Sequence, residues 1–430
     1  MRPKIYSING GRGKLLSVCT DRFKSELLTV QFAVPIQKTS AQRHTLLMDL
    51  LCRGTEQYPS KALFSRRLDD LYATAVAPYS RRIGDMQVFG FTAELLGSRF
   101  VGGGDGILAD VVQMIAQLIL HPYLPGGVFH SAYLESERTH LRDAIRARIN
   151  HPRAYARAKC RSLLFEGEPA ALSLLGEENT LDDIDAADLT ALWRETVQTL
   201  SPTFFYVGAT DGEKLARLLE RNFSPMGDFL HPYTANVSAQ TRPFQNVQED
   251  MPLCQSKLAL GFRTDISLSH PLSPATSLLN DIFGGSPASK LFLNVREKRS
   301  ICYHCSSTYD VYKGAIFAES GISADRKEEA ELAIRKEFED IVKGHITDAE
   351  WNAAKRLHEF AYKQAFDHPS SICAFYMARD LIGFEETLEQ RRAAFAAVTR
   401  EDVAAAASRV REGVEFFLHG ALGEEEEDEE

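Results

Sequence analysis

The sequence predicts an α+β fold made of two similar units in tandem, each an antiparallel sheet backed by helices. First, segments with alternating apolar residues, typical of strands, are mixed with segments that show helical spacing. Second, several local patterns of residues 1–222 return in the same order after residue 251. Third, Pro225, Pro232 and Pro243 interrupt a polar stretch between the two sets. We interpret residues 223–250 as the linker between the halves.

The repeated patterns pair short stretches of the two halves. Residues 278–283 (LLNDIF) resemble residues 46–51 (LLMDLL), and SKLF at 289–292 corresponds to SKALF at 60–64. His-Pro precedes a helical pattern at 151–152 and again at 368–369, and the strand pattern at 416–421 resembles that at 204–209. We therefore expect a first domain over 1–222, a second over 251–423 and an acidic tail over 424–430.

The first half supplies most of the expected elements. Alternation predicts strands at 28–34, 76–82, 86–95 and 203–208, and helical spacing predicts helices at 41–52, 60–72, 106–120, 129–147, 152–165 and 180–197. The glycine-rich stretch 101–106 lacks the strand and helix context of a nucleotide site, so a loop is expected. The second half repeats the scheme, with a strand at 258–262.

Composition excludes several classes of protein. The net charge is −10, but residues 424–430 are all acidic, which leaves about −3 for the body of the chain. Such a body lacks the basic stripe of a nucleic-acid binder. No run of about 18 apolar residues occurs, so no membrane-spanning helix is predicted. The N-terminus has no signal-peptide pattern, and an odd number of scattered cysteines, seven, fits the reducing cytoplasm.

Cys302 and Cys305 form an isolated C-x-x-C in the second half. A structural zinc site would need a second ligand pair, which the sequence does not offer at recognisable spacing. In a regular strand, the two thiols would also point to opposite faces. The expectation is therefore that this pair has neither a metal nor a redox role.

Residues 289–303, SKLFLNVREKRSICY, change from helical to strand pattern. Leu291, Phe292 and Val295 form one apolar face at helical spacing, with Arg296 at its edge. The β-prone residues that start at position 301 then predict a strand that contains Tyr303. Taken alone, this pattern describes an ordinary helix-to-strand corner with a solvated arginine.

The duplicated architecture, together with GG-x-x-x-SKLF-x-x-VREKRSICY in the second copy, resembles the insulinase/pitrilysin family of zinc metallopeptidases. The similarity is to the half-length, mitochondrial-processing-peptidase-like branch and covers the chain apart from the acidic tail. It implies two domains that enclose a cavity, across which Arg296 and Tyr303 bind the substrate backbone and the developing oxyanion. One well-placed donor of this kind stabilises the transition state by roughly 3–4 kcal/mol.

The zinc ligands of the family are missing. Its first copy carries HxxEH before [KR]GT, and here residues 53–55 (RGT) set the register. The two ligand positions then hold Thr45 and Asp49, and Met48 occupies the position of the general base. The third ligand position reads Asp143, and His44 lies one residue too early, turned about 100° away on the helix. We expect no metal or other cofactor in this chain and no catalysis by the chain alone.

Two hypotheses of different classes remain. In the first, this chain is the zinc-less subunit of a heterodimer and lends Arg296 and Tyr303 to the zinc site of an HxxEH-bearing homologous partner. A peptide or protein substrate would then lie extended along a sheet edge. In the second, the chain is a scaffold, with Arg296 in a salt bridge to Glu297 or Asp281. The resemblance also permits a link to elongation factor P modification, although no residue argues for it.

Overall fold

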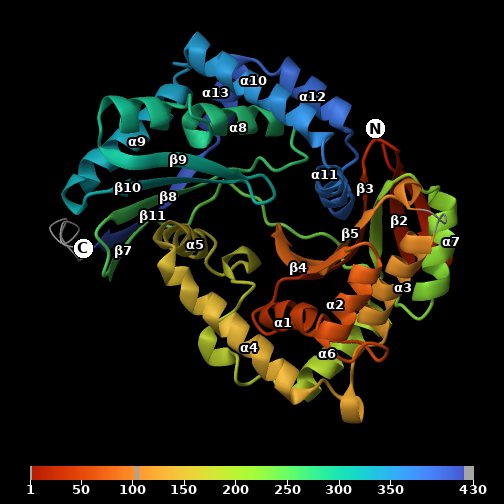
Figure 1. The fold of residues 1–430 in the computed structure, drawn as a ribbon. Helices are drawn as coiled ribbons and strands as arrows, with labels where there is room; N and C mark the ends of the chain where they lie inside the picture. Colours follow the sequence, from red (N-terminus) through yellow and green to blue (C-terminus); the bar gives the residue numbers. More distant parts are fainter. Residues whose placement is uncertain (1, 102–105, 421–430) are drawn as a thin grey trace. The chain divides into compact units, whose positions relative to one another are not determined.

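The computed structural model describes residues 2–101 and 106–420, which form two β-sheets covered by helices, so the predicted α+β class is confirmed (Figure 1). By contacts, the chain divides into two compact units. Unit 1 comprises Met1–Arg146, Leu172–Thr234 and Gln364–Thr387. Unit 2 comprises Ala147–Ala171, Ala235–Lys363 and the chain from Leu388 onward. The predicted boundaries at 222 and 251 divide the sequence into repeats, whereas these contacts group segments from both halves.

Unit 1 contains a six-stranded sheet in the order β1-β2-β6-β3-β5-β4. Its strands are β1 (Lys4–Ile8), β2 (Gly13–Cys19), β3 (Ser25–Pro35), β4 (Ala75–Ile83), β5 (Met86–Leu96) and β6 (Thr203–Gly208). All neighbours are antiparallel except β2 and β6, which are parallel. The sequence pattern did not predict β1 or β2, because neither has a long apolar alternation.

The helices of unit 1 include α1 (Ala41–Leu51) and α4 (Ser131–Arg146), which carry the zinc-motif positions. The others are α2 (Lys61–Asp70), α3 (Gly106–Leu120), α6 (Ala186–Thr199) and α7 (Gly212–Phe223). Leu46 and Leu47 of α1 share one apolar core with Phe89 and Phe91 of β5. This burial holds α1 against the sheet and fixes which of its faces meets α4.

Unit 2 contains a five-stranded sheet in the order β7-β11-β8-β10-β9. Its strands are β7 (Gln245–Met251), β8 (Ser256–Arg263), β9 (Cys302–Asp310), β10 (Ala315–Ile322) and β11 (Arg411–Gly420). The pair β7–β11 is parallel and the other pairs are antiparallel. The helices are α8 (Ser273–Asn280), α9 (Lys327–Val342), α10 (Asp348–Ala365), α12 (Leu388–Ala397) and α13 (Arg400–Ser408). Two π-helices, η7 (Asp281–Gly285) and η8 (Leu291–Lys298), lead into β9, where an ordinary helix was expected.

Each sheet is packed by one helix from the other half of the sequence (Figure 1). Helix α5 (Pro152–Leu164) belongs to unit 2 and packs on β8 and β11. Helix α11 (Pro369–Leu381) belongs to unit 1 and packs on β6 and β3. Both begin with the proline of a repeated His-Pro pair, a residue suited to the first helical position because its missing N–H needs no partner there.

Specific side-chain contacts hold α5 and α11 on their sheets. Tyr376 of α11 stacks on Phe205 of β6 with 6.4 Å between ring centroids. On α5, Cys160 approaches the sheet where Gly261 of β8 leaves room, since a Cβ there would lie 3.0 Å from the Cys160 sulfur. The packing of α5 and α11 on a sheet from the other half of the sequence therefore depends on shape complementarity in both apolar cores.

The glycine-rich loop predicted at 101–106 lies mostly outside the described residues. Among helices in the described parts of the chain, none has the length and apolar character needed to cross a membrane.

Candidate functional site

Two of the zinc-motif positions on α1 are built into the interior of unit 1. The Thr45 hydroxyl oxygen lies 3.0 Å from the carbonyl oxygen of Leu174, and Gln87 Nε2 donates to it at 3.3 Å. Met48 is 3% exposed and belongs to the apolar core. The Thr45 hydroxyl is engaged in hydrogen bonds and the Met48 side chain is packed in the core, so neither could ligate a metal or move a proton there.

His44 is also a core residue. Its ring stacks on Phe89 of β5 with 4.6 Å between centroids. Burial lowers its pKa to about 4, because the imidazolium would lose its hydration. His44 is therefore a neutral aromatic of the core.

The remaining HxxEH position, Asp49, lies near a charged cluster made of Glu137 and His140 from α4 and Arg53 from the turn after α1. Arg53 forms an ion pair with Glu137, and His140 Nδ1 lies 3.1 Å from Glu137 Oε2. Burial raises the pKa of Asp49 to about 6, and the negative charge of Glu137 adds to the shift, while His140 and Arg53 oppose it. Asp143, the expected third ligand position, is exposed. The i, i+3 spacing of Glu137 and His140 was the signal that could have identified them.

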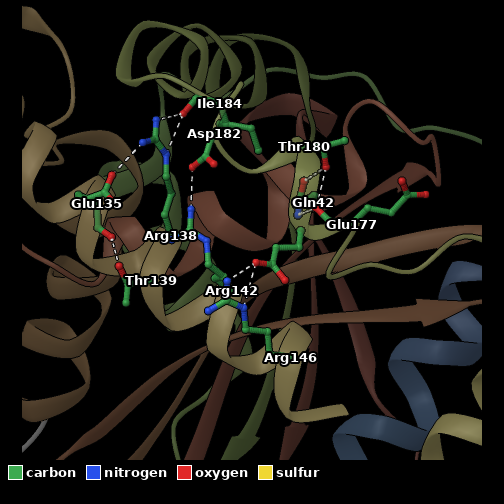
Figure 2. A network of polar contacts seen from close by, with 11 residues as sticks. Gln42, Glu135, Arg138, Thr139, Arg142, Arg146, Glu177, Thr180, Asp182 and Ile184 are labelled. Carbon is green, nitrogen blue, oxygen red and sulfur yellow. Dashed lines mark hydrogen bonds and ion pairs between the residues drawn. The ribbon is translucent and has the colours of Figure 1, made fainter. Parts of the chain in front are cut away.

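Three arginines on one side of helix α4 fix the orientation of the helix about its own axis (Figure 2). Arg138 donates to the carbonyl oxygen of Ile184 at 3.2 Å, Arg142 pairs with Asp182 at 2.6 Å, and Arg146 Nε donates to Glu178 at 2.9 Å. The three lie at i, i+4 and i+8, hence on one side of the helix. Their attachment to one segment, residues 178–184, turns the side with Glu137 toward α1.

Within residues 2–101 and 106–420, no group of three His, Cys, Asp or Glu side chains could hold a metal ion. The Asp49 cluster accordingly offers an arginine where a metal site would need a further ligand.

Replacing Asp49 by asparagine is expected to stabilise unit 1 by on the order of 2 kcal/mol above pH 7. The folded-state pKa of Asp49, about 6, lies above the ordinary 3.8. The folded state therefore binds the proton more tightly, and stability falls as the pH rises from 3.8 to 6. Urea unfolding of both proteins at several pH values measures this, and the gain should vanish near pH 4. Asp143→Asn, exposed on α4, is the control; an unchanged pH slope in Asp49→Asn contradicts the prediction.

Arg296 lies on the π-helix η8 with a partly exposed side chain. Its guanidinium lies 4.7 Å from the centroid of the Phe292 ring, and Nη1 is 3.4 Å from Glu297 Oε1. Both contacts are individually weak at a surface position. Asp281, the other expected partner, instead contacts His358, with 2.6 Å between Asp281 Oδ2 and His358 Nε2.

Tyr303 is presented by an irregular corner between η8 and the edge strand β9. Ser300 has a φ of 49°, a conformation that is costly for a non-glycine residue, and its N–H donates to the carbonyl oxygen of Arg296 at 3.0 Å. In β9, Ile322 of β10 pairs with Cys302 and Gly321 pairs with His304, so Tyr303 is the extra residue of a β-bulge. Its side chain is 61% exposed.

The charge of Arg296 acts on Cys302 and His304, the two residues on either side of Tyr303. The structure therefore brings the predicted pair to one corner of unit 2. A guanidinium and a phenol at such a corner are both hydrogen-bond donors for a peptide carbonyl oxygen.

Two sheet-and-helix units, core side chains at zinc-motif positions and an exposed Arg–Tyr corner are the features expected of a zinc-ligand-deficient relative of the insulinase/pitrilysin-type peptidases. Residues 183–357 match the family described as "Peptidase M16 inactive domain". The protein named "Probable inactive metalloprotease YmfF" of Bacillus subtilis (strain 168) is 27% identical over 406 residues, 94% of this chain and 95% of that protein. The chain is therefore similar to proteins of the peptidase M16 family, of the inactive type.

Solved structures share this fold along nearly the whole chain. A conserved protein from Enterococcus faecalis V583 superposes with a TM-score of 0.90 at 24% identity, covering 98% of this chain and 99% of that one. A peptidase M16 inactive domain from Pseudomonas fluorescens gives a TM-score of 0.81 at 17% identity, with the same coverage of 98% and 99%. These structures confirm the predicted fold, and the match to the family model and the Bacillus relative agree with the predicted resemblance. The roles of Arg296 and Tyr303 stay predictions.

Proposed function

We propose that this chain is the non-catalytic subunit of a heterodimeric metallopeptidase whose zinc is held by an HxxEH-bearing homologous partner. The observation that carries the proposal is a contrast within the chain. The zinc-motif positions Thr45 and Met48 are occupied by interior side chains, whereas the corner with Arg296 and Tyr303 keeps a positive φ and a β-bulge that present them outward. Backbone strain of this kind is typical of sites that position functional groups.

In the proposed complex, Arg296 and Tyr303 act on the carbonyl of the scissile peptide bond. As the partner's zinc-activated water adds, negative charge builds on the carbonyl oxygen, and the phenol O–H and guanidinium N–H groups donate to it. Phe292 beneath the guanidinium and Glu297 beside it limit its rotation, which lowers the entropy lost when substrate binds. The substrate is a peptide or protein segment in extended conformation. We place this activity in the cytoplasm, because all seven cysteines are free.

The test mixes this chain with an HxxEH-bearing homologue from the same genome and follows cleavage of a quenched fluorescent peptide library. Arg296→Ala is expected to lower kcat of the mixture on the order of 100-fold, because one donor to the oxyanion is lost. Tyr303→Phe removes only the hydroxyl and should act in the same direction.

Arg299→Ala is the matched control, since Arg299 is exposed at the end of the same segment. It should leave the rate unchanged. Equal cleavage by the wild-type and Arg296→Ala mixtures would refute the proposed catalytic role.

A scaffold function is the second candidate, favoured by the existing ion pair and ring contact of Arg296. In that case Arg296→Ala lowers the thermal stability of unit 2 or its assembly with the partner, and the cleavage rate follows only the amount of complex formed. Titrating the partner to saturation separates the two functions.

A further inference from the structure

Cys302 and Cys305 lie on the same face of β9, so the expectation that they point to opposite faces is wrong. The bulge at Tyr303 inserts one residue between them and reverses the alternation that a regular strand would impose. Both belong to the apolar core of unit 2, with exposed fractions of 8% for Cys302 and 3% for Cys305.

Their spacing is close to that of a disulfide. Cys302 pairs with Ile322 of β10, and Cys305 pairs with Ser320. These partners are two positions apart, so the Cα atoms of the cysteines are separated by about 6.5–7 Å. Disulfides span Cα distances of about 4.4–6.8 Å. Each thiol acts on the pKa of the other, so the two side chains are neighbours, and a small movement of the bulge would bring the sulfurs into bonding range.

The surroundings distinguish the two thiols. The hydrogen bond from Cys305 lowers the pKa of Cys302 to about 7, although burial opposes it, and the Ser320 hydroxyl and the charge of Arg296 act in the same direction. The same hydrogen bond, together with burial, raises the pKa of Cys305. By contrast, burial raises the pKa of Cys373 to about 11. Cys302 is also the less buried of the two thiols and lies next to the exposed Tyr303, so we assign it as the nucleophilic member of the pair.

We propose that Cys302 and Cys305 form a reversible redox pair that a small peroxide converts to an intramolecular disulfide. The Cys302 thiolate attacks one peroxide oxygen, the O–O bond breaks, and the products are Cys302 sulfenic acid and hydroxide. The Cys305 sulfur then attacks the Cys302 sulfur, the S–O bond breaks, and water leaves with the Cys305 proton. The two thiols lose two electrons in total, and one peroxide is reduced to two waters. A small oxidant is required because both sulfurs are nearly buried.

Closing the disulfide would shorten the bulge that presents Tyr303. The Cα atoms must approach, and Tyr303 is the residue that the bulge inserts between them. This consequence rests on the proposed function: oxidation would switch off the contribution of Arg296 and Tyr303 to cleavage. Because the strand geometry is at the limit for a disulfide, the oxidised form should be readily reduced by a dithiol.

Trypsin makes the test direct, since it cuts after Arg299 and Lys313 and nowhere between them. The full chain is treated with hydrogen peroxide, alkylated under denaturing conditions and digested. Peptide 300–313 is expected to lack two hydrogen atoms in mass and to resist alkylation until dithiothreitol is added. Cys305→Ser should instead retain a sulfenic acid on Cys302 that dimedone captures, and Cys19→Ser should leave the disulfide unaffected.

If peptide 300–313 remains alkylated at both cysteines while the exposed Cys19 is oxidised, the proposal is overturned. Dimedone capture on a residue other than Cys302 in the Cys305→Ser protein would overturn the assignment of the nucleophile. The mass readout needs no partner subunit, so it stands whether or not Arg296→Ala affects cleavage. In the mixture, the oxidised chain should support cleavage at least tenfold more slowly than the reduced chain, and dithiothreitol should restore the rate.

Discussion

Replacing Lys313 by methionine is expected to destabilise unit 2 by about 3–5 kcal/mol. The Lys313 side chain is fully enclosed, with an exposed fraction of 0%. Its ammonium donates to Glu168 Oε2 at 2.9 Å and to the carbonyl oxygen of Asn236 at 2.7 Å. Arg263 donates to the other Glu168 oxygen at 2.6 Å. Removing one cation leaves the partly buried Glu168 carboxylate with Arg263 as its remaining cation, which is costly away from bulk water.

This prediction can be measured because each unit contains one of the two tryptophans, Trp193 in unit 1 and Trp351 in unit 2. In a Trp193→Phe background, urea unfolding followed by fluorescence reports on unit 2. Lys343→Met is the control, because Lys343 is 58% exposed in a surface ion pair with Glu339, and it should cost less than about 0.5 kcal/mol.

A double variant tests the electrostatic reason. Adding Glu168→Gln to Lys313→Met removes the uncompensated charge, so the double variant should lose less stability than the sum of the two single ones. Strict additivity would show that packing of the lysine stem, and not charge, is the dominant contribution.

Replacing Gly90 by alanine is expected to destabilise unit 1 by about 4 kcal/mol or more. Gly90 lies in β5 with a φ of 154°, and a Cβ there would be 2.0 Å from the backbone carbonyl oxygen of Val30 in β3. The clash is with backbone, so β3 and β5 would have to separate in the middle of the sheet. Unfolding followed through Trp193 in a Trp351→Phe background measures the loss.

Gly383→Ala separates strain from overlap. Gly383 is also in unit 1, has a φ of 67°, and nothing lies within 4 Å of the position a Cβ would take. Its replacement tests positive φ alone and should cost about 1–2 kcal/mol. If Gly90→Ala costs no more than this control, the backbones of β3 and β5 do not approach closely enough at Gly90 to exclude a Cβ.

The elements with strong periodicity could be predicted from the sequence, and those defined by partners could not. The strands around residues 28–34 and 86–95 have long apolar alternation and lie near the predicted positions as β3 and β5. Strands β1 and β7 have a mixed polar pattern, because each forms one edge of its sheet. These two edge strands carry little apolar alternation, so sequence periodicity did not detect them, whereas the opposite edge strands β4 and β9 were predicted.

The candidate site shows the same division. The VREKRSICY segment located Arg296 and Tyr303 in the sequence, and the RGT register located Thr45, Met48 and Asp49. The neighbours of Asp49 could not be found in this way, because Glu137 and His140 approach it through the packing of α4 on α1. Which side of α4 faces α1 depends on arginine contacts to a segment about 40 residues further along the chain.

The sequence by itself predicted a duplicated α+β protein that resembles the insulinase/pitrilysin peptidases but lacks the HxxEH set, because residue identity and spacing carry that information directly. Only the tertiary structure decided that α5 and α11 are exchanged between the units, because their His-Pro starts are local but the sheets they cover are remote. It also decided that Cys302 and Cys305 share a face, since a bulge depends on the pairing with β10 and leaves no periodic pattern in the sequence.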